Sequence, residues 1–388
     1  MSRAGRVADA FRAVFGTACA GVWSAPGRVN LIGEHTDYNG GSVLPLALPH
    51  RTWAAAAPRA DGLLRLHSAR FPGELVQLAV AELAPGAVRG WAAYPAGVAW
   101  ALRRAGYGTG GADVHVETDV PLGAGLSSSA ALEVAVALAL TGLAGRAFPA
   151  GYAARLQLAR LTRDAEHAFT GMPCGIMDQA AALCCTTGHV LHLGTRDLAL
   201  RQVPFDPAAH GLRLLVVDTR VVHALRDGAY AARRAGCEAG ARALGVRLLC
   251  DLTPSQLDWG LWELAPPLRP LLRHVLTEEE RVARVVSRLE AGDPRAVGES
   301  LTAGHASLRD DFAVSCAELD LAVSVACRAG ALGARMTGGG FGGSAVVLAE
   351  ETDAAGVARE VGAAFAAAGH RPPRVFAVEP ADGARRDR

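Results

Sequence analysis

Hydrophobic and polar positions follow two periods along the first third of the chain. Helical spacing over about residues 5–16 predicts an amphipathic helix. An extended segment at 22–24 leads into a polar loop at 26–41, and residues 112–120 alternate as a strand does. A glycine-rich turn then opens a helix within 121–143. Because its residues are apolar nearly all round, we expect this helix to be buried.

The rest of the chain predicts helices and strands in no regular alternation. A helix from about Tyr152 to Phe169 ends at a Gly-Met-Pro turn. We expect strands at 188–193, 213–218, 344–349 and 374–379, and helices near 228–244, 277–290, 293–308, 316–329 and 352–368. This order favours an α+β fold over repeated βαβ units. A length of 388 residues fits two domains, which we place at 1–200 and 201–388.

Composition excludes several classes of protein. Hydrophobic residues make up 51% of the chain, enough for a sizeable core, so we exclude disorder. The longest apolar run, 134–144, is shorter than the roughly 18 residues of a membrane span, and residues 1–16 lack a signal-peptide core. A net charge of +1 points to neither nucleic acid nor a membrane surface. Eight cysteines without CxxC spacing favour reduced thiols in a cytoplasmic protein, and nothing implies an obligatory protein partner.

The chain contains no lysine, so all 39 basic residues are arginine. This excludes a Walker A loop and the strand lysine of protein kinases, both of which need lysine at the phosphates. It also excludes Schiff-base and pyridoxal-phosphate chemistry, which need an amine nucleophile.

The first candidate site is the loop Pro121–Ser129, between a predicted strand and a helix start. Glycines at 123 and 125 let the backbone approach an anion, and the helix dipole favours negative charge. Three serine hydroxyls add donors and a Mg²⁺ ligand. The alternative is a serine N-cap after a tight turn. A dinucleotide-binding fingerprint is disfavoured, because its third glycine position holds Ser128.

The second candidate is Arg28–Asp37, RVNLIGEHTD, in which one cation, two carboxylates and a histidine lie among apolar residues. Such charges are costly to bury unless they are paired or bind a ligand. Glu34, His35 and Asp37 would offer donors and acceptors to a polyol. The alternative is an exposed loop with ordinary surface charges.

The third candidate is Glu166–Gln179, EHAFTGMPCGIMDQ. Two carboxylates twelve residues apart, Glu166 and Asp178, suit a metal ligand and a general base. The alternative for Asp178 is the N-cap of the following helix.

The fourth candidate is Thr337–Ser344, where five glycines fall within six positions before a strand. Such a loop must let its backbone approach something closely. Either a phosphate or another strand would satisfy that requirement.

Together these segments resemble the galactokinase family of GHMP small-molecule kinases. PGRVNLIGEHTDYNGG (26–41) resembles its sugar signature, and GAGLSSSAALE (123–133) its phosphate loop. CGIMDQ (174–179) is similar to the segment of its catalytic aspartate, and MTGGGFGGS (336–344) to its third glycine motif. The ending PADGA (380–384) also resembles the usual tail, so the resemblance spans nearly the whole chain. It implies a ribosomal protein S5 domain 2-like N-terminal domain, a ferredoxin-like C-terminal domain, and a site between them.

The resemblance also implies a role for each segment. ATP would be held by the loop Gly123, Ala124, Gly125, Leu126, Ser127, Ser128 and Ser129, and its adenine by Trp91, which otherwise reads as a core tryptophan. Mg²⁺ would be held by Ser129 and Glu166. Asp178 would accept the proton of the sugar hydroxyl or orient it, and Arg28 would lie between that carboxylate and the phosphate.

On the sugar side, the resemblance implies contacts from Glu34, His35, Thr36 and Asp37. Tyr230 joins them through a weaker match, the segment AYAARRAGCE at 229–238, where a tyrosine equally packs against a core. The implied reaction is ATP-dependent phosphorylation of α-D-galactose at C1. The alternatives are a kinase for N-acetylgalactosamine or another sugar, and a non-catalytic galactose sensor. The phosphate loop, Arg28 and Asp178 are intact, which disfavours a sensor.

Overall fold

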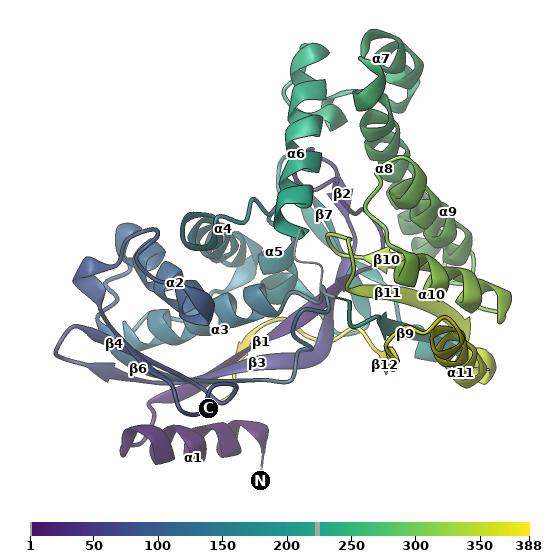
Figure 1. The fold of residues 1–388 in the computed structure, drawn as a ribbon. Coiled ribbons are helices and arrows are strands. Elements are labelled where there is room, and N and C mark those ends of the chain that lie inside the picture. Colours follow the sequence, from purple (N-terminus) through teal and green to yellow (C-terminus); the bar gives the residue numbers. More distant parts are fainter. Residues whose placement is uncertain (1, 222–225) are drawn as a thin grey trace.

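The computed structural model describes residues 2–221 and 226–388, and its central element is a six-stranded mixed sheet (Figure 1). Only β4 and β6 pair in parallel, and every other neighbouring pair is antiparallel. The strand order is β13 (Arg385–Arg386), β1 (Gly21–Asn30), β3 (Pro45–Arg59), β6 (Gly111–Thr118), β4 (Leu63–Ser68) and β5 (Leu75–Ala79).

Helices cover both faces of this sheet (Figure 1). One face carries α2 (Ala93–Arg104), α3 (Ser128–Leu143), α4 (Gly151–Thr170) and α5 (Met177–Cys184). The opposite face carries α1 (Arg3–Phe15), whose Val7 and Phe11 pack on Val22 and Trp53. As the sequence predicts, α3 is buried along most of its length, because its residues are almost all Ala, Val and Leu.

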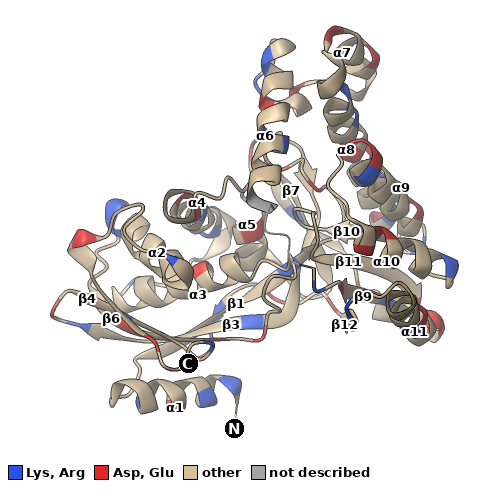
Figure 2. Ribbon diagram, in the orientation of Figure 1, with Lys and Arg blue, Asp and Glu red and all other residues tan. Residues whose placement is uncertain are grey.

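The second half of the chain builds a four-stranded antiparallel sheet in the order β10 (Gly333–Thr337), β11 (Ser344–Glu350), β9 (Leu212–Asp218) and β12 (Arg374–Val378). Its helices are α6 (Arg226–Ala243), α7 (Leu257–Glu263), α8 (Arg269–Glu290), α9 (Val297–Asp310), α10 (Ala317–Arg328) and α11 (Glu351–Ala367). Positive and negative residues are interspersed along α8 (Figure 2), in keeping with the net charge of +1. A third sheet is formed by β2 (Ser42–Val43), β7 (His189–Gly194) and β8 (Leu200–Pro204).

One apolar cluster joins the two larger sheets. It contains Val29 and Leu46 from β1 and β3, and Leu214 and Val346 from β9 and β11, all fully buried. Burial of this kind is the main favourable term in folding. The ends of β1 and β10 also lie side by side, because the Thr337 hydroxyl is 3.0 Å from both the Asn30 N–H nitrogen and the Asn30 carbonyl oxygen, and both strands lead into site loops.

The α+β class is confirmed, but several elements differ from the sequence prediction. Helix α8 begins at Arg269, eight residues before the predicted start at 277. The sequence reading also missed α2 and the strands β2–β5. Alanines dominate the middle of β3, where strand propensity is low, and tertiary packing against β1 and β6 makes it a strand.

Residues 381–388 return to the N-terminal sheet. Ala381 bridges to Ala47, and β13 pairs with Trp23 and Ser24 of β1. The division of the chain near residue 200 stays a prediction, since the β7–β8 hairpin crosses that point. None of the described helices is long and apolar enough to cross a membrane. The eight cysteines, all within the described residues, form no disulfide.

Candidate active site

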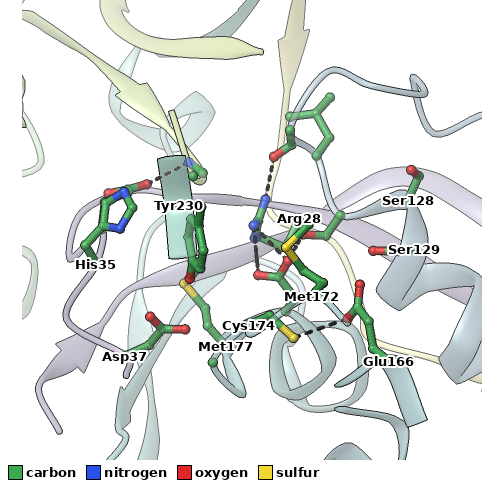
Figure 3. A pocket seen from close by; sticks show the side chains of 18 of the residues that line it. Arg28, His35, Asp37, Ser128, Ser129, Glu166, Met172, Cys174, Met177 and Tyr230 are labelled. Atoms are coloured by element: carbon green, nitrogen blue, oxygen red, sulfur yellow. Dashed lines mark hydrogen bonds and ion pairs between the residues drawn. The ribbon is translucent and has the colours of Figure 1, made fainter. Parts of the chain in front are cut away.

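A cleft of about 330 Å³ opens where the two larger sheets meet, and all four candidate segments contribute to its lining. Figure 3 shows His35, Asp37 and Tyr230 on one side of Arg28, and Ser128, Ser129 and Glu166 on the other. The remaining lining residues are Glu34, Tyr94, Gly123, Gly125, Leu126, Ser127, Met172, Cys174, Gly175, Met177, Asp178, Gly338 and Gly339.

Arg28 and Asp178 form a two-pronged ion pair at the centre of the cleft. Arg28 Nε donates to Asp178 Oδ1 at 2.8 Å and Nη2 donates to Oδ2 at 2.9 Å. Arg28 Nη1 donates to the Gly125 carbonyl at 2.7 Å, so the same side chain holds the phosphate loop. Only 6% of the arginine side chain is exposed, against 23% of the aspartate. The pair is thus rigid on the arginine side and open to the cleft on the carboxylate side.

The N-cap interpretation of Asp178 is wrong, whereas Ser127 does occupy the N-cap position of α3. Asp178 lies in the first turn of α5, after the cap residue Ile176, and its carboxylate faces Arg28. Ser127 precedes α3 with a left-handed backbone, φ 56°, and makes no capping hydrogen bond. Its hydroxyl donates to Asp178 instead. A non-glycine residue at positive φ is uncommon, and strain of this kind is typical of functional loops.

The third glycine loop lies against the phosphate loop. A Cβ on Gly338 would stand 3.0 Å from the Gly125 carbonyl, and one on Gly343 would stand 3.1 Å from the Ala124 carbonyl. The Ser344 hydroxyl donates to the same Ala124 carbonyl at 2.7 Å. The glycines therefore let two loops, about 215 residues apart in sequence, touch backbone to backbone.

The turn after β1 is fixed by its own polar groups. The Thr36 hydroxyl lies 2.8 Å from the carbonyl oxygens of both Gly33 and Ser42, and the Asn39 amide donates to the His35 carbonyl at 2.7 Å. Both side chains are almost fully buried. Thr36 thus shapes the turn, and its hydroxyl points to backbone rather than into the cleft.

Glu34 is held by a buried charge network from the C-terminal half. Arg335 of β10 is fully buried and pairs with Glu34 on one side and with Glu278 of α8, at 2.8 Å, on the other. Gly338 N–H also donates to Glu34 Oε1 at 3.1 Å. Burial raises the pKa of Glu34 to about 7, although Arg335 acts to lower it. Removing one member of such a network leaves a buried charge uncompensated.

Asp37 and Gly175 meet at the end of the cleft that is lined by the turn after β1. A Cβ on Gly175 would stand 1.7 Å from Asp37 Oδ2, a distance no side chain tolerates. Burial, and then the nearby Asp178 carboxylate, raise the pKa of Asp37 to about 6. Glycine at 175 is therefore what leaves room for the Asp37 carboxylate.

Glu166 lies at the other end of the cleft. The Gln179 amide donates a hydrogen bond to the Glu166 carboxylate at 2.7 Å, and the Ser129 hydroxyl and Cys174 thiol are also hydrogen-bonded to this carboxylate. Burial, and then the charge of Asp178, raise the pKa of Glu166. The same Gln179 amide donates at 3.1 Å to Glu133, a fully buried acid within the apolar helix α3. In the part of the chain that the structure describes, no arginine or histidine forms an ion pair with Glu166.

Most of the predicted site residues line this one cleft, but three do not. Thr36 and Ala124 are buried beneath it. Trp91 lies outside the lining, where its Nε1 donates to Glu74 at 3.4 Å and its ring stacks on Phe71. For these three, direct ligand contact stays a prediction that the cleft does not support.

The sequence reading missed several residues that shape the site. Tyr94 lines the cleft three positions after Trp91, in the same segment WAAYPAG. Glu133 and Arg335 carried a usable signal, because each is the lone charged residue in an otherwise apolar or small-residue element. Glu278 gave none, since it lies in a run of three glutamates on a helix.

Three sequence profiles match the chain. The galactokinase galactose-binding signature matches residues 9–58, the N-terminal domain of GHMP kinases matches 93–186, and the C-terminal domain of GHMP kinases matches 285–367. These ranges contain the turn after β1 at 31–41 (the sugar turn), the phosphate loop with Asp178, and the third glycine loop.

Relatives are similar in sequence to this chain over nearly its whole length. A galactokinase from Streptomyces coelicolor is 58% identical over 99% of this chain and 98% of its own, and one from Mycobacterium tuberculosis is 44% identical over 93% and 98%. The crystal structure of Lactococcus lactis galactokinase complexed with galactose superimposes with a TM-score of 0.92, at 30% identity over 98% and 99% of the two chains. Methanococcus jannaschii mevalonate kinase shares the fold, with a TM-score of 0.66 at 16% identity over 93% and 98%. With the sugar turn, phosphate loop, aspartate and third glycine loop gathered in one cleft, the chain belongs to the galactokinase family of GHMP kinases.

Proposed function

We propose that this protein transfers the γ-phosphoryl group of ATP to the C1 hydroxyl of α-D-galactose, giving galactose 1-phosphate and ADP. The observation that carries the proposal is the Arg28–Asp178 pair, which stands between the phosphate loop and the sugar turn. Phosphoryl transfer depends mainly on positioning and on neutralising charge, and a cleft with these two sides supplies both.

The sugar would lie against Glu34, His35, Asp37 and Tyr230, with its C1 hydroxyl at Asp178. The hydroxyl oxygen forms the new bond to phosphorus as the bond from phosphorus to the ADP oxygen breaks. The hydroxyl proton passes to Asp178, or is held by it until the bond has formed. Support comes from the partial exposure of the Asp178 side chain, 23%, which remains although Arg28 bonds to both of its oxygens and Ser127 to one.

The triphosphate would lie against the backbone N–H groups of 123–129 and the start of α3. The positive end of that helix and the Arg28 guanidinium stand where negative charge builds up. Arg28 also holds the Gly125 carbonyl at 2.7 Å, so it aligns the phosphate loop with the carboxylate that receives the sugar.

A magnesium ion fits the corner formed by Ser129 and Glu166. Mg²⁺ takes oxygen ligands and usually binds through one or two carboxylates together with phosphate oxygens and water. Glu166 is a buried carboxylate without a cationic partner among the described residues, and Asp178 adds negative charge nearby. When bound, the ion would neutralise charge on the phosphates. These two residues would hold it, and Gln179 would keep the Glu166 carboxylate turned toward it.

The test is an ADP-release assay with a panel of sugars, each with and without Mg²⁺. We expect turnover with galactose, far less with glucose or N-acetylgalactosamine, and none without the ion. If only another sugar is turned over, that sugar and not galactose is the substrate. Binding of galactose and ATP without turnover would instead favour a sensor.

A further inference from the structure

The ring of His35 is locked in place at the sugar side of the cleft. Its centroid lies 4.7 Å from that of Phe312, 5.4 Å from Tyr230 and 5.8 Å from Tyr38. The backbone of His35 is left-handed, with φ 62°, and the residue is 5% exposed. Three aromatic neighbours thus fix the direction in which each ring nitrogen points.

The two ring nitrogens have different surroundings. Nδ1 lies 2.8 Å from the Tyr38 hydroxyl. Nε2 is buried and makes no hydrogen bond of good geometry with any described residue, although the Gly339 backbone lies near enough to raise the pKa of the ring, and His35 itself lines the cleft. A buried polar atom without a partner is rare in native proteins, and it points to a group supplied by a ligand.

The protonation states of His35 and Tyr38 decide which ring nitrogen of His35 carries the hydrogen. Burial lowers the pKa of His35 to about 3, and His274 adds to the effect, so the neutral ring has one N–H. Burial raises the pKa of Tyr38 well above its ordinary value, so the phenol keeps its proton. Nδ1 is the one acceptor within hydrogen-bond distance of that phenol in the described part of the chain. With the phenol donating to Nδ1, the ring proton sits on Nε2.

We propose that Tyr38 is a positioning residue that holds the ring proton of His35 on Nε2, so that His35 donates a hydrogen bond to a sugar hydroxyl oxygen. The inference rests on the proposed function, because it takes the sugar to lie in this cleft. When ionised, Glu34 and Asp37 can only accept hydrogen bonds. A fixed donor at His35 beside them therefore lets this turn offer both acceptors and a donor to the hydroxyls of a polyol. A sugar hydroxyl that donates a hydrogen bond to one of these carboxylates can then accept a hydrogen bond from His35.

Tyr38→Phe removes one hydroxyl and leaves the aromatic packing. Tyr152→Phe is the matched control, because Tyr152 also has a hydroxyl with one hydrogen bond, from Gln202, but lies at the surface away from the cleft. Long-range ¹H–¹⁵N spectra of histidine-labelled protein read the tautomer directly, and His35→Gln assigns the His35 signals.

We expect wild-type His35 to carry its proton on Nε2, and Tyr38→Phe to populate both tautomers. The variant should raise the KM for galactose about five- to tenfold, with kcat and the KM for ATP within twofold, and the control should change none of these. A wild-type proton on Nδ1 would overturn the proposal, as would an unchanged tautomer and KM in a folded Tyr38→Phe protein. If galactose is not a substrate, the spectra still decide the role of Tyr38, so the two failures are distinguishable.

Discussion

The two walls of the cleft are built by different means. The nucleotide wall is mostly backbone, from the loop 123–129 to the glycines at 338–343 that touch it. The sugar wall is mostly side chains on one short turn, and these are held by groups far away in sequence, such as Arg335 and Glu278. One wall depends on the absence of side chains and the other on a particular set of them.

This difference predicts different sensitivities. A backbone wall binds phosphates through N–H groups that nearly any residue supplies, provided that glycines allow the approach. A side-chain wall fails when any one of its charged partners is lost, including partners that never touch the sugar. Substitutions on the sugar wall should therefore separate the KM for galactose from the KM for ATP.

The largest effect is expected where the walls meet. Asp178→Asn keeps the shape of the side chain but removes the acceptor for the sugar proton, so kcat should fall about 10²–10⁴-fold. The KM for ATP should change little, because the phosphate loop is retained. Steady-state kinetics together with thermal melts check this. A folded Asp178→Asn enzyme with near wild-type kcat would contradict the mechanism.

Arg28→Lys tests whether the pair acts as one unit. A lysine cannot copy the fork that holds both Asp178 and the Gly125 carbonyl, so kcat should fall as well. The double variant should be little worse than the worse single variant. Full additivity would show that the two residues act independently.

The next largest effect is expected on the sugar wall alone. Gly175→Ala places a Cβ where Asp37 Oδ2 now lies, so the carboxylate must move. The displaced carboxylate loses its place in the cleft, so the KM for galactose should rise about tenfold while the KM for ATP holds. The overpacking itself should lower the free energy of unfolding by about 1–3 kcal/mol. Gly362→Ala, with open space around its Cβ, is the control. Equal rises in both KM values would mean that the walls are not independent.

A smaller effect is expected in the pH dependence of the KM for galactose, which should distinguish the sugar wall from the nucleotide wall. Burial, and then Asp178, raise the pKa of Asp37 to about 6. As pH falls below about 6 the carboxylate is protonated, and the KM for galactose should rise by up to about tenfold per unit. The raised pKa also means that the stability contributed by Asp37 falls as pH rises from about 4 through 6. Asp37→Asn should remove the part of each profile that lies near pH 6 and leave the part due to Glu34, whose pKa burial raises to about 7, and a wild-type KM that is constant from pH 5 to 8 would contradict this.

The smallest effect is expected at Trp91. Its ring stacks on Phe71 outside the cleft, so Trp91→Phe should change the KM for ATP less than twofold. Titration of ATP against the variant by fluorescence or kinetics measures it. A tenfold rise would show that the nucleotide extends to this tryptophan and that the nucleotide wall includes an aromatic side chain.

The sequence predicted the nucleotide wall better than the supports of the sugar wall. Glycines, serines and the start of α3 are neighbours in the chain, so a local pattern contains the whole loop. The residues Glu34, His35 and Asp37 were also found, because their polarity stands out between apolar neighbours. The buried helix α3 and the α+β class followed from periodicity alone.

What the sequence did not predict is mostly long-range. Arg335 pairs with Glu34 across about 300 residues, and Glu278 bonds to Gly33 across 245. No local spacing records such a contact, and a buried arginine reads like a surface one in a lysine-free chain. The strand β3 was missed for another reason, since its run of alanines is set by packing and not by strand propensity.

The return of residues 381–388 to the first sheet also bears on how the protein is made. Trp23 of β1 pairs with Arg386, and Arg51 of β3 donates to the carbonyls of Asp382 and Gly383. A ribosome adding about 5–20 residues per second takes on the order of 20–70 s to travel from one partner to the other. Through that interval the strand carrying Arg28 has an open edge, which is a template for pairing with other chains. The nascent chain therefore keeps this edge exposed until residues 381–388 have been made and can pair with it.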